Sequence, residues 1–318
     1  MSDQAQVESL KVLVTGGNGF IGSHLAEELV TRNALVSLLD LQFSANTEGI
    51  NCDKIVGDVR DYDEVWKAVR GKDIVFHLGA VSRVIWGQEQ PLNCWQTNLL
   101  GTVNVLEAAR RAETRPIVFY ASSREVYGEP RYLPVDEAHL KNPKSVYGTS
   151  KLCAEKACIS YHNAFGVKTV VLRFSNVYGS DRDQLDRVAP NFMLKALAND
   201  PITLYGGTQV LDFSFIDDVI SGILLAYDKA CTQAGDIVGT DLHFVTGMGV
   251  SVSDLAEKIV KTCGSSSIIT KEDSRSFEVQ SFVGNPQKAH AVLGYSPRIE
   301  LERGLLTLKQ RLGRQTKA

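Results

Sequence analysis

The segment that decides the fold is residues 10–22, which read LKVLVTGGNGFIG. Its first six residues are mostly apolar and β-branched, which predicts a short buried strand. An amphipathic stretch from Ser23 to Arg32 follows and predicts a helix. Between them, Gly16, Gly19 and Gly22 have the spacing at which a backbone turns tightly, approaches a pyrophosphate and joins helix to strand. The free N–H groups of the helix start favour phosphate, so we predict a nucleotide-binding turn here.

A second strand is predicted over residues 34–40 and ends at Asp40. An acid that lies about 20 residues beyond such glycines binds the ribose hydroxyls of adenosine. The next residues, Leu41-Gln42-Phe43, include no arginine, so a 2′-phosphate would meet repulsion and no partner. Asp40 therefore favours NAD over NADP as the cofactor. The alternative interpretation is that Asp40 only caps the end of a strand.

Strands and helices then alternate along the first half of the chain. Uninterrupted alternation predicts an α/β fold with a Rossmann-type, doubly wound parallel sheet. The second half is less regular, which predicts a smaller C-terminal substrate-binding lobe. We expect residues 1–175 and about 212–240 to form the NAD-binding domain, and residues 176–211 and 241–318 to form this second lobe. The predicted strands are 53–57, 72–78, 115–121, 167–174, 201–205 and 213–216, and the predicted helices are 61–69, 93–111, 190–198, 217–228, 251–262 and 301–312.

Composition excludes several classes of protein. A chain of 318 residues, 44% of them hydrophobic, can bury a large core. The formal net charge of −3 argues against a general nucleic-acid binder. The sequence contains no run of about 18 apolar residues, so no membrane span is predicted. The six cysteines form no CxxC pair and the first residues lack a basic, apolar leader, so we expect reduced thiols, no metal site and a cytoplasmic location.

Tyr147 and Lys151 lie four residues apart on the first turns of a predicted helix, so both side chains occupy one face. A free phenol is a poor base at neutral pH because its pKa is about 10, and a nearby cation favours the phenolate. The alternative is two unrelated surface residues. The polar pair Ser122-Ser123 follows the predicted strand 115–121, whose end should face a bound ligand in an open parallel sheet. This combination predicts an active site.

Together these segments resemble the extended short-chain dehydrogenase/reductase family of NAD-dependent nucleotide-sugar epimerases and dehydratases. The resemblance covers nearly the whole chain and is more specific to the family than to one reaction. The matching segments are 15–22, 57–59, 77–80, Asn98, 122–123, Tyr147 with Lys151, 173–179 and 211–219.

The resemblance implies a role for each matching position. Tyr147 would take the proton of a sugar hydroxyl, and Ser123 would hydrogen-bond the same oxygen. Lys151 would bind the nicotinamide ribose and lower the pKa of Tyr147, while hydride passes from the sugar to NAD and leaves a 4-keto sugar. The implied substrate is a nucleotide-diphosphate sugar, with a UDP-sugar favoured, bound at Asn176, Asn191 and Arg275 of a homodimer. The implied NAD contacts are Gly16, Asn18, Gly19, Phe20, Ile21, Gly22, Asp40, Asp58, Val59, Leu78, Ala80, Asn98, Tyr147 and Lys151.

The residues after Ser122 bear on the reaction. Family dehydratases read Thr-Asp-Glu there, and this chain reads Ser123-Arg124-Glu125. In such enzymes the Glu removes the C5 proton and the Asp protonates the departing C6 hydroxyl. Glu125 is retained, but Arg124 cannot act as an acid. We predict a dehydratase acting through Tyr147 and Glu125, similar to the 5,6-dehydratases of tunicamycin-type antibiotic assembly, which form a 5,6-ene on UDP-N-acetylglucosamine.

Two alternatives and one departure stay open. In a 4-epimerase the ketone would rotate and be reduced from its other face, and Glu125 would be dispensable. A non-catalytic NAD-binding regulator would not need the Ser123, Tyr147 and Lys151 set. Many relatives that use UDP-sugars have a diphosphate-clamping arginine where this chain has Leu211. Arg182, Arg187 or Arg275 are candidates to replace it.

Overall fold

The computed structural model of the chain describes residues 9–274 and 277–315. Its centre is a sheet of seven parallel strands in the order β10-β6-β5-β4-β1-β2-β3. The strand order reverses beside β1, which is the point where open α/β sheets bind their ligands. The predicted Rossmann-type, doubly wound fold is therefore confirmed. The strands are β1 (Lys11–Thr15), β2 (Leu35–Asp40), β3 (Asp53–Val56), β4 (Ile74–His77), β5 (Ile117–Ser123), β6 (Thr169–Phe174) and β10 (Asp241–Phe244).

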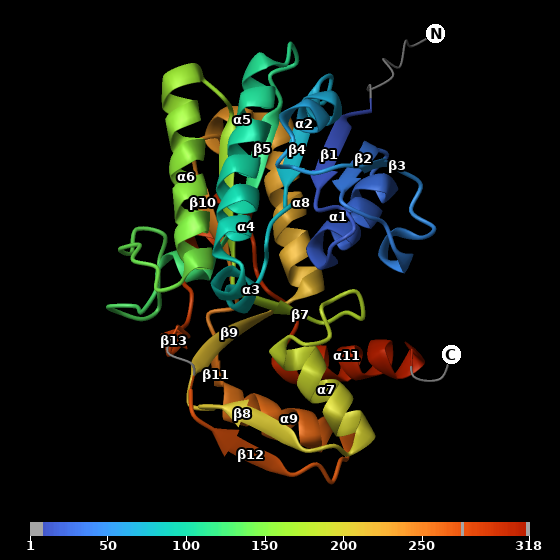
Figure 1. Ribbon diagram of the computed structural model, residues 1–318, viewed down its shortest axis with the longest axis vertical. Helices are drawn as coiled ribbons and strands as arrows, with labels where there is room; N and C mark the ends of the chain where they lie inside the picture. The colour runs from blue at the N-terminus through green and yellow to red at the C-terminus, as the bar shows by residue number, and fades with distance from the viewer. Residues whose placement is uncertain (1–8, 275–276, 316–318) are drawn as a thin grey trace.

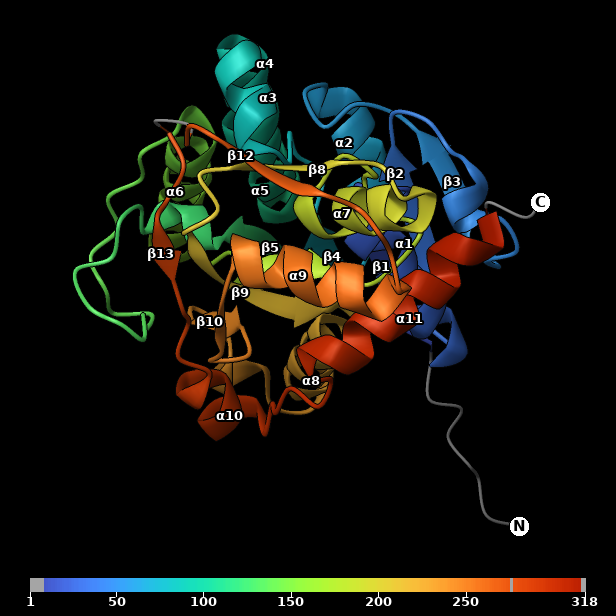
Figure 2. The same cartoon turned by 90° about the horizontal axis from the view of Figure 1, so that it is seen from below.

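Helices cover both faces of this sheet (Figure 2). Successive strand residues point to opposite faces, so Leu13 and Val75 pack under one layer of helices while Val12 and Phe76 pack under the other. Burial on both faces explains why the strands are almost continuously apolar. One layer is α2 (Tyr62–Val69), α5 (Gly101–Arg111) and α6 (Val146–Phe165), and the other is α1 (Phe20–Thr31), α8 (Ile216–Gln233) and α10 (Gln287–Leu293).

A smaller lobe lies beyond the carboxyl ends of the main strands (Figure 1). It contains a four-stranded sheet of β7 (Asn176–Tyr178), β9 (Val210–Phe215), β11 (Gly249–Ser251) and β13 (Ser281–Phe282). Beside it lie the pair β8 (Ile202–Tyr205) and β12 (Ile269–Glu272) and the helices α7 (Val188–Ala198), α9 (Val252–Cys263) and α11 (Leu301–Gln315). Among the helices of the described residues, none is long and apolar enough to cross a bilayer.

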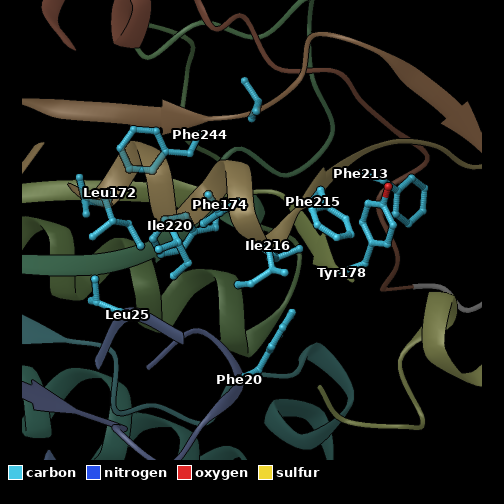
Figure 3. Packing of buried hydrophobic residues seen from close by; sticks show 14 of the residues in the cluster. Phe20, Leu25, Leu172, Phe174, Tyr178, Phe213, Phe215, Ile216, Ile220 and Phe244 are labelled. Carbon is cyan, nitrogen blue, oxygen red and sulfur yellow. The ribbon is translucent and has the colours of Figure 1, made fainter. Parts of the chain in front are cut away.

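The two parts share one hydrophobic core. Leu172 and Phe244 from the main sheet and Phe213 and Phe215 from the lobe belong to a single buried cluster (Figure 3). The ring of Phe215 lies edge-on to Tyr178, with ring centroids 5.5 Å apart. Because the core is continuous, the lobe is held in a fixed position over the edge of the main sheet.

The expected partition differs from the structure in two places. Residues 241–244, expected in the lobe, form β10 of the main sheet, where Leu242 pairs with Leu172. Residues 212–215, expected in the NAD-binding domain, belong to β9 of the lobe, so the return to the main unit begins at Ile216. Both assignments depend on pairing between strands that are distant in the sequence, and local strand propensity gives no information on such pairing.

The helix predicted over residues 93–111 is interrupted. It consists of α4 (Pro91–Trp95), a π-helical segment η2 (Gln96–Leu100) and α5. A further short helix, α3 (Val84–Glu89), precedes it and was not predicted. Single π-helical turns occur often at functional sites.

Truncation of the shared core should destabilise both parts together. Phe215 is 1% exposed, so Phe215→Ala should lower the free energy of unfolding by about 3–5 kcal/mol, because a cavity remains where the ring was. Urea unfolding should still show one transition. Met248→Ala is the control, since Met248 is 71% exposed and should cost less than about 0.5 kcal/mol. Two separate transitions would contradict the single core.

Candidate active site

A cleft of about 1460 Å³ separates the carboxyl edge of the main sheet from the lobe. A pocket for one drug-sized ligand holds about 300–1,000 Å³. This cleft is therefore large enough for a dinucleotide and a second ligand together. Its walls come from the glycine turn, from the ends of β2, β4 and β5, from the start of α6, and from β7, α7, β8 and β9 of the lobe.

The glycine turn has no room for side chains. Gly16 has a φ of +67°, and a Cβ added there would lie 2.7 Å from the backbone nitrogen of Gly79. A Cβ on Gly22 would lie 2.2 Å from the carbonyl oxygen of Gly16. Helix α1 starts at Phe20 directly after Gly19, which has no side chain to cap it. The N–H groups of its first turn can therefore bind a pyrophosphate, and the turn fits a dinucleotide such as NAD.

The other predicted cofactor residues of this region lie along the same wall. Asp40 ends β2, and its carboxylate accepts the backbone N–H of Asn18 at 2.9 Å and of Leu41 at 2.8 Å. Burial raises the pKa of Asp40 above its ordinary value. Asp58 lines the cleft and is bound by Arg60 at 2.8 Å. Phe20, Ile21, Val59, Leu78 and Ala80 also line the cleft.

Asn98 is an exception, because it does not line the cleft. Its amide is buried and makes its hydrogen bonds within the protein. The oxygen accepts the N–H of Val81 at 2.8 Å, and the nitrogen donates to the Val81 carbonyl and to Ser150. The expected direct contact with the cofactor is therefore replaced by support of Val81, which does line the cleft. His77 has a structural role: it is fully buried and hydrogen-bonded to Thr15 at 2.7 Å, and burial lowers its pKa to about 3.

Tyr147 lies on the first turn of α6, which Ser145 caps by accepting the N–H of Gly148 at 3.0 Å. The phenol is hydrogen-bonded to Ser123 at the end of β5. Burial raises the pKa of Tyr147 to about 12, and the bond to Ser123 and the charge of Arg187 oppose this rise. The structure thus brings Ser123 and Tyr147 together at the edge of the sheet.

Lys151 lies one turn after Tyr147 and also lines the cleft. Its Nζ donates to the carbonyl oxygen of Ala121 at 2.9 Å, and burial lowers its pKa to about 8. Ser123 and Arg187 lower the pKa of Tyr147, and Glu125 and Cys94 raise it. A direct effect of Lys151 on Tyr147 stays a prediction.

Glu125 lies in the short turn η3 (Arg124–Val126) that follows β5. Its backbone N–H donates to Ser123 Oγ at 3.2 Å. Its carboxylate pairs with Arg124 at 3.0 Å, and the two side chains are only 8% and 11% exposed. Both residues line the cleft near Tyr147. The site therefore holds a buried carboxylate whose charge is compensated by a guanidinium.

A buried ionic network lies behind these residues. Arg173 of β6 binds Glu155 of α6 through two hydrogen bonds of 2.8 Å. Glu155 also accepts a bond of 2.5 Å from Ser122, the neighbour of Ser123. Arg173 contacts Asp241 of β10 as well, at 2.7 Å. The network fixes α6 against β5 and therefore fixes the phenol of Tyr147 against the strand end.

The predicted substrate residues have mixed outcomes. Asn176 and Asn191 line the cleft on the lobe side, and Asn176 donates to the carbonyl oxygen of Asp212 at 3.2 Å. Arg275 lies outside the described residues. Leu211 lines the cleft with an apolar side chain. Of the arginines considered as its replacement, Arg182 pairs with Glu27 at 2.9 Å and Arg187 with Asp183 at 3.6 Å.

Sequence reasoning missed the strap formed by residues 180–187, which crosses the cleft. Arg182 binds Glu27 of α1 at one side, and Asp186 pairs with Arg83, beyond β4, at the other. Asp183 in its middle lines the cleft, is buried, and burial raises its pKa to about 6. The density of charges in SDRDQLDR was the available signal, but only its arginines were considered.

Comparison with known proteins places this site in context. Residues 12–238 match the model of the NAD dependent epimerase/dehydratase family. The putative UDP-glucose 4-epimerase of Methanocaldococcus jannaschii is 36% identical over 92% of this chain and 95% of its own length. UDP-glucose 4-epimerase from Thermotoga maritima, solved with UDP-glucose, has a TM-score of 0.90 at 26% identity, over 97% of this chain and 100% of its own. DesIV, a dTDP-glucose 4,6-dehydratase from Streptomyces venezuelae solved with NAD, has a TM-score of 0.89 at 26% identity, over 97% and 98%.

The raised pKa of Asp183 predicts a pH-dependent stability. The folded-state pKa of about 6 exceeds the ordinary value of 3.8. Between these values the folded protein binds more protons than the unfolded chain, so wild-type stability falls as pH rises through 6. The amide introduced by Asp183→Asn has no such proton to lose, so this variant should gain about 1–2 kcal/mol relative to wild type between pH 5 and pH 7.5 in urea unfolding. Asp254→Asn, at an exposed position, should show no such gain. An equal gain in both variants would contradict the assignment.

Proposed function

Because the chain belongs to the NAD dependent epimerase/dehydratase family, we propose that it removes water from a nucleotide sugar. The observation that carries the proposal is the buried carboxylate of Glu125 in the cleft near the phenol of Tyr147. An enzyme that only oxidises and reduces one carbon needs a single proton-transfer group. A second buried base near the first suits a reaction that also breaks a neighbouring C–H bond.

The protein is an enzyme of this family and its cofactor is NAD. The glycine turn, the start of α1 and Asp40 would hold NAD, which accepts hydride from a sugar carbon and later returns it. Tyr147 takes the proton from the C4 hydroxyl of the sugar. Ser123 orients that phenol through their hydrogen bond. Lys151 supplies the buried cation one turn away, which favours negative charge on the phenol and on the alkoxide.

Glu125 acts after C4 has become a ketone. The ketone acidifies the C5 proton, and the carboxylate of Glu125 removes it. The hydroxyl on C6 takes up this proton from Glu125 and leaves as water, so one water is lost and a double bond forms between C5 and C6. Arg124 stays charged and offsets the charge of Glu125 in a site with little solvent. With UDP-N-acetylglucosamine as the substrate, reduction of the dehydrated 4-ketone back to an alcohol would give the 5,6-ene of this sugar, which is the specific product we propose.

A second candidate is a 4-epimerase acting on UDP-glucose or UDP-N-acetylglucosamine. The ion pair between Arg124 and Glu125 favours this reaction, because a carboxylate that is bound to a guanidinium is not free to remove a proton. Two of the similar proteins also bear that name. In this reaction Glu125 has no chemical step. A non-catalytic NAD-binding regulator is less well supported, since binding alone would not need the phenol hydrogen-bonded to Ser123.

The reaction can be assigned in deuterated water with UDP-N-acetylglucosamine and UDP-glucose, followed by mass and proton spectra. Dehydration removes one water and changes the C5 and C6 signals. Glu125→Gln should then slow water loss by about 10²–10⁴-fold, the usual contribution of a general base, while oxidation at C4 persists as absorbance at 340 nm. Tyr147→Phe should stop both steps.

Two results would contradict the dehydratase. The first is interconversion at C4 without deuterium at C5, which would establish the epimerase. The second is an undiminished loss of water in Glu125→Gln. Turnover that survives in Tyr147→Phe would instead contradict the enzymatic role of the phenol.

We further propose a homodimer and a cytoplasmic location, both first inferred from the sequence. The dimer is supported by Leu92 of α4, Leu100 of η2 and Ile159 of α6, which are 69%, 54% and 46% exposed on segments that pack against one another. Leu100→Glu should yield a monomer by light scattering, because a charge would be buried in the interface. A wild-type monomer would contradict this proposal.

A further inference from the structure

Positively charged side chains line the cleft, and the protein itself binds nearly all of them. Arg124 pairs with Glu125 at 3.0 Å, and Arg182 pairs with Glu27 at 2.9 Å. The others with a partner are Arg60 with Asp58, Arg83 with Asp186, Arg187 with Asp183, and Lys151 with the carbonyl oxygen of Ala121. Lys195 also lines the cleft. Within residues 9–274 and 277–315, its ammonium forms no ion pair with a carboxylate and no hydrogen bond to another acceptor.

The position of Lys195 on α7 indicates which part of a bound ligand its free charge could contact. Arg187, Asn191 and Lys195 follow one another at intervals of four, so they share one face of the helix, and all three line the cleft. Eight residues of helix rise about 12 Å. Arg187, directly before the helix, lowers the pKa of Tyr147. Strand β8, which follows the C-terminal end of α7 in the chain, packs against the helix. A helical side chain points back towards the N-terminus, so the ammonium of Lys195 reaches towards Asn191.

The far end of the cleft is different in character. Thr203 and Tyr205 of β8 and Phe277 line it and offer aromatic surface and hydroxyl groups, and Glu278, next to Phe277, lines the cleft as well. A nucleoside fits such a wall, and the reacting sugar must lie at Tyr147. The phosphates of a nucleotide sugar join these two parts and must therefore pass the middle of α7. Leu211, which also lines the cleft, supplies no charge.

We propose that Lys195 binds the diphosphate of the nucleotide-sugar substrate, with Asn191 beside it. The inference rests on the proposed function for the nature of the substrate. An ammonium is a compact charge with three donors, and its hydrogen bonds to phosphate are stronger than neutral ones. Because no carboxylate competes for Lys195 among the described residues, the ligand meets a free cation.

The test is calorimetric binding of UDP and of uridine to NAD-saturated protein. Lys195→Ala should weaken UDP binding by at least about tenfold, the effect of one lost charge-assisted bond, and leave uridine binding unchanged. Lys195→Arg, which retains the charge, should stay within about threefold of wild type. Lys67→Ala removes an exposed lysine of α2 and should change neither ligand. In turnover, Lys195→Ala should raise KM for the nucleotide sugar and leave kcat nearly unchanged.

The outcomes separate this inference from the proposed function. If wild type binds UDP and Lys195→Ala binds it equally well, the role of Lys195 is overturned while a nucleotide-sugar substrate stands. Equal weakening of uridine would also overturn it, because the loss would not depend on phosphate. If wild type binds none of UDP, dTDP and GDP, the nucleotide-sugar function falls, and the inference falls with it.

Discussion

The arrangement of the site depends on one buried ion pair, Arg173 with Glu155. Its two bonds of 2.8 Å join β6 to α6, and the bond from Ser122 to Glu155 brings the end of β5 into the same network. Tyr147 and Lys151 precede Glu155 on α6 at intervals of four, so they share its face. Loss of one partner would leave a buried charge uncompensated, a cost of several kcal/mol. The position of the phenol is therefore set by a contact outside the cleft.

A second constraint comes from the direction of the strands. Because the strands of the main sheet are parallel, their carboxyl ends meet at one edge, and the glycine turn, Asp40 and Ser123 reach the cleft from β1, β2 and β5. Most charges that arrive there are matched by partners, as with Arg124 and Glu125 or Arg182 and Glu27. The charged groups of the cleft that lack such a partner are therefore the ones available to exchange a proton or bind an anion.

Local spacing explains what the sequence alone could predict. The glycine turn, the acid at Asp40 and the pair Tyr147 and Lys151 depend on intervals within one strand–turn–helix or one helix, so they were found without a structure. β10 could not be found in this way, because four residues join the main sheet only through pairing with β6. The role of Asn98 depends on Val81 and Ser150, which no pattern within the helix reveals. Helical spacing also predicts that Lys195 shares a face with Asn191, which it follows by one turn. Its lack of an ion-pair partner among the described residues depends on the fold and cannot be predicted from spacing.

These placements divide the chemistry among separate elements. In the function proposed above, the first turn of α6 and the end of β5 supply proton transfer at one sugar oxygen, and the buried network joins these two elements. The turn η3 directly after Ser123 adds Glu125 and Arg124. In the proposed function these two residues decide the fate of the oxidised sugar, while the strand geometry stays unchanged. Helix α7 belongs to the lobe and lines the cleft, and the proposed contact of Lys195 would hold the substrate beyond its reacting carbon. If both proposals hold, a change in η3 alters the reaction without altering the nucleotide, and a change in α7 alters the nucleotide without altering the reaction.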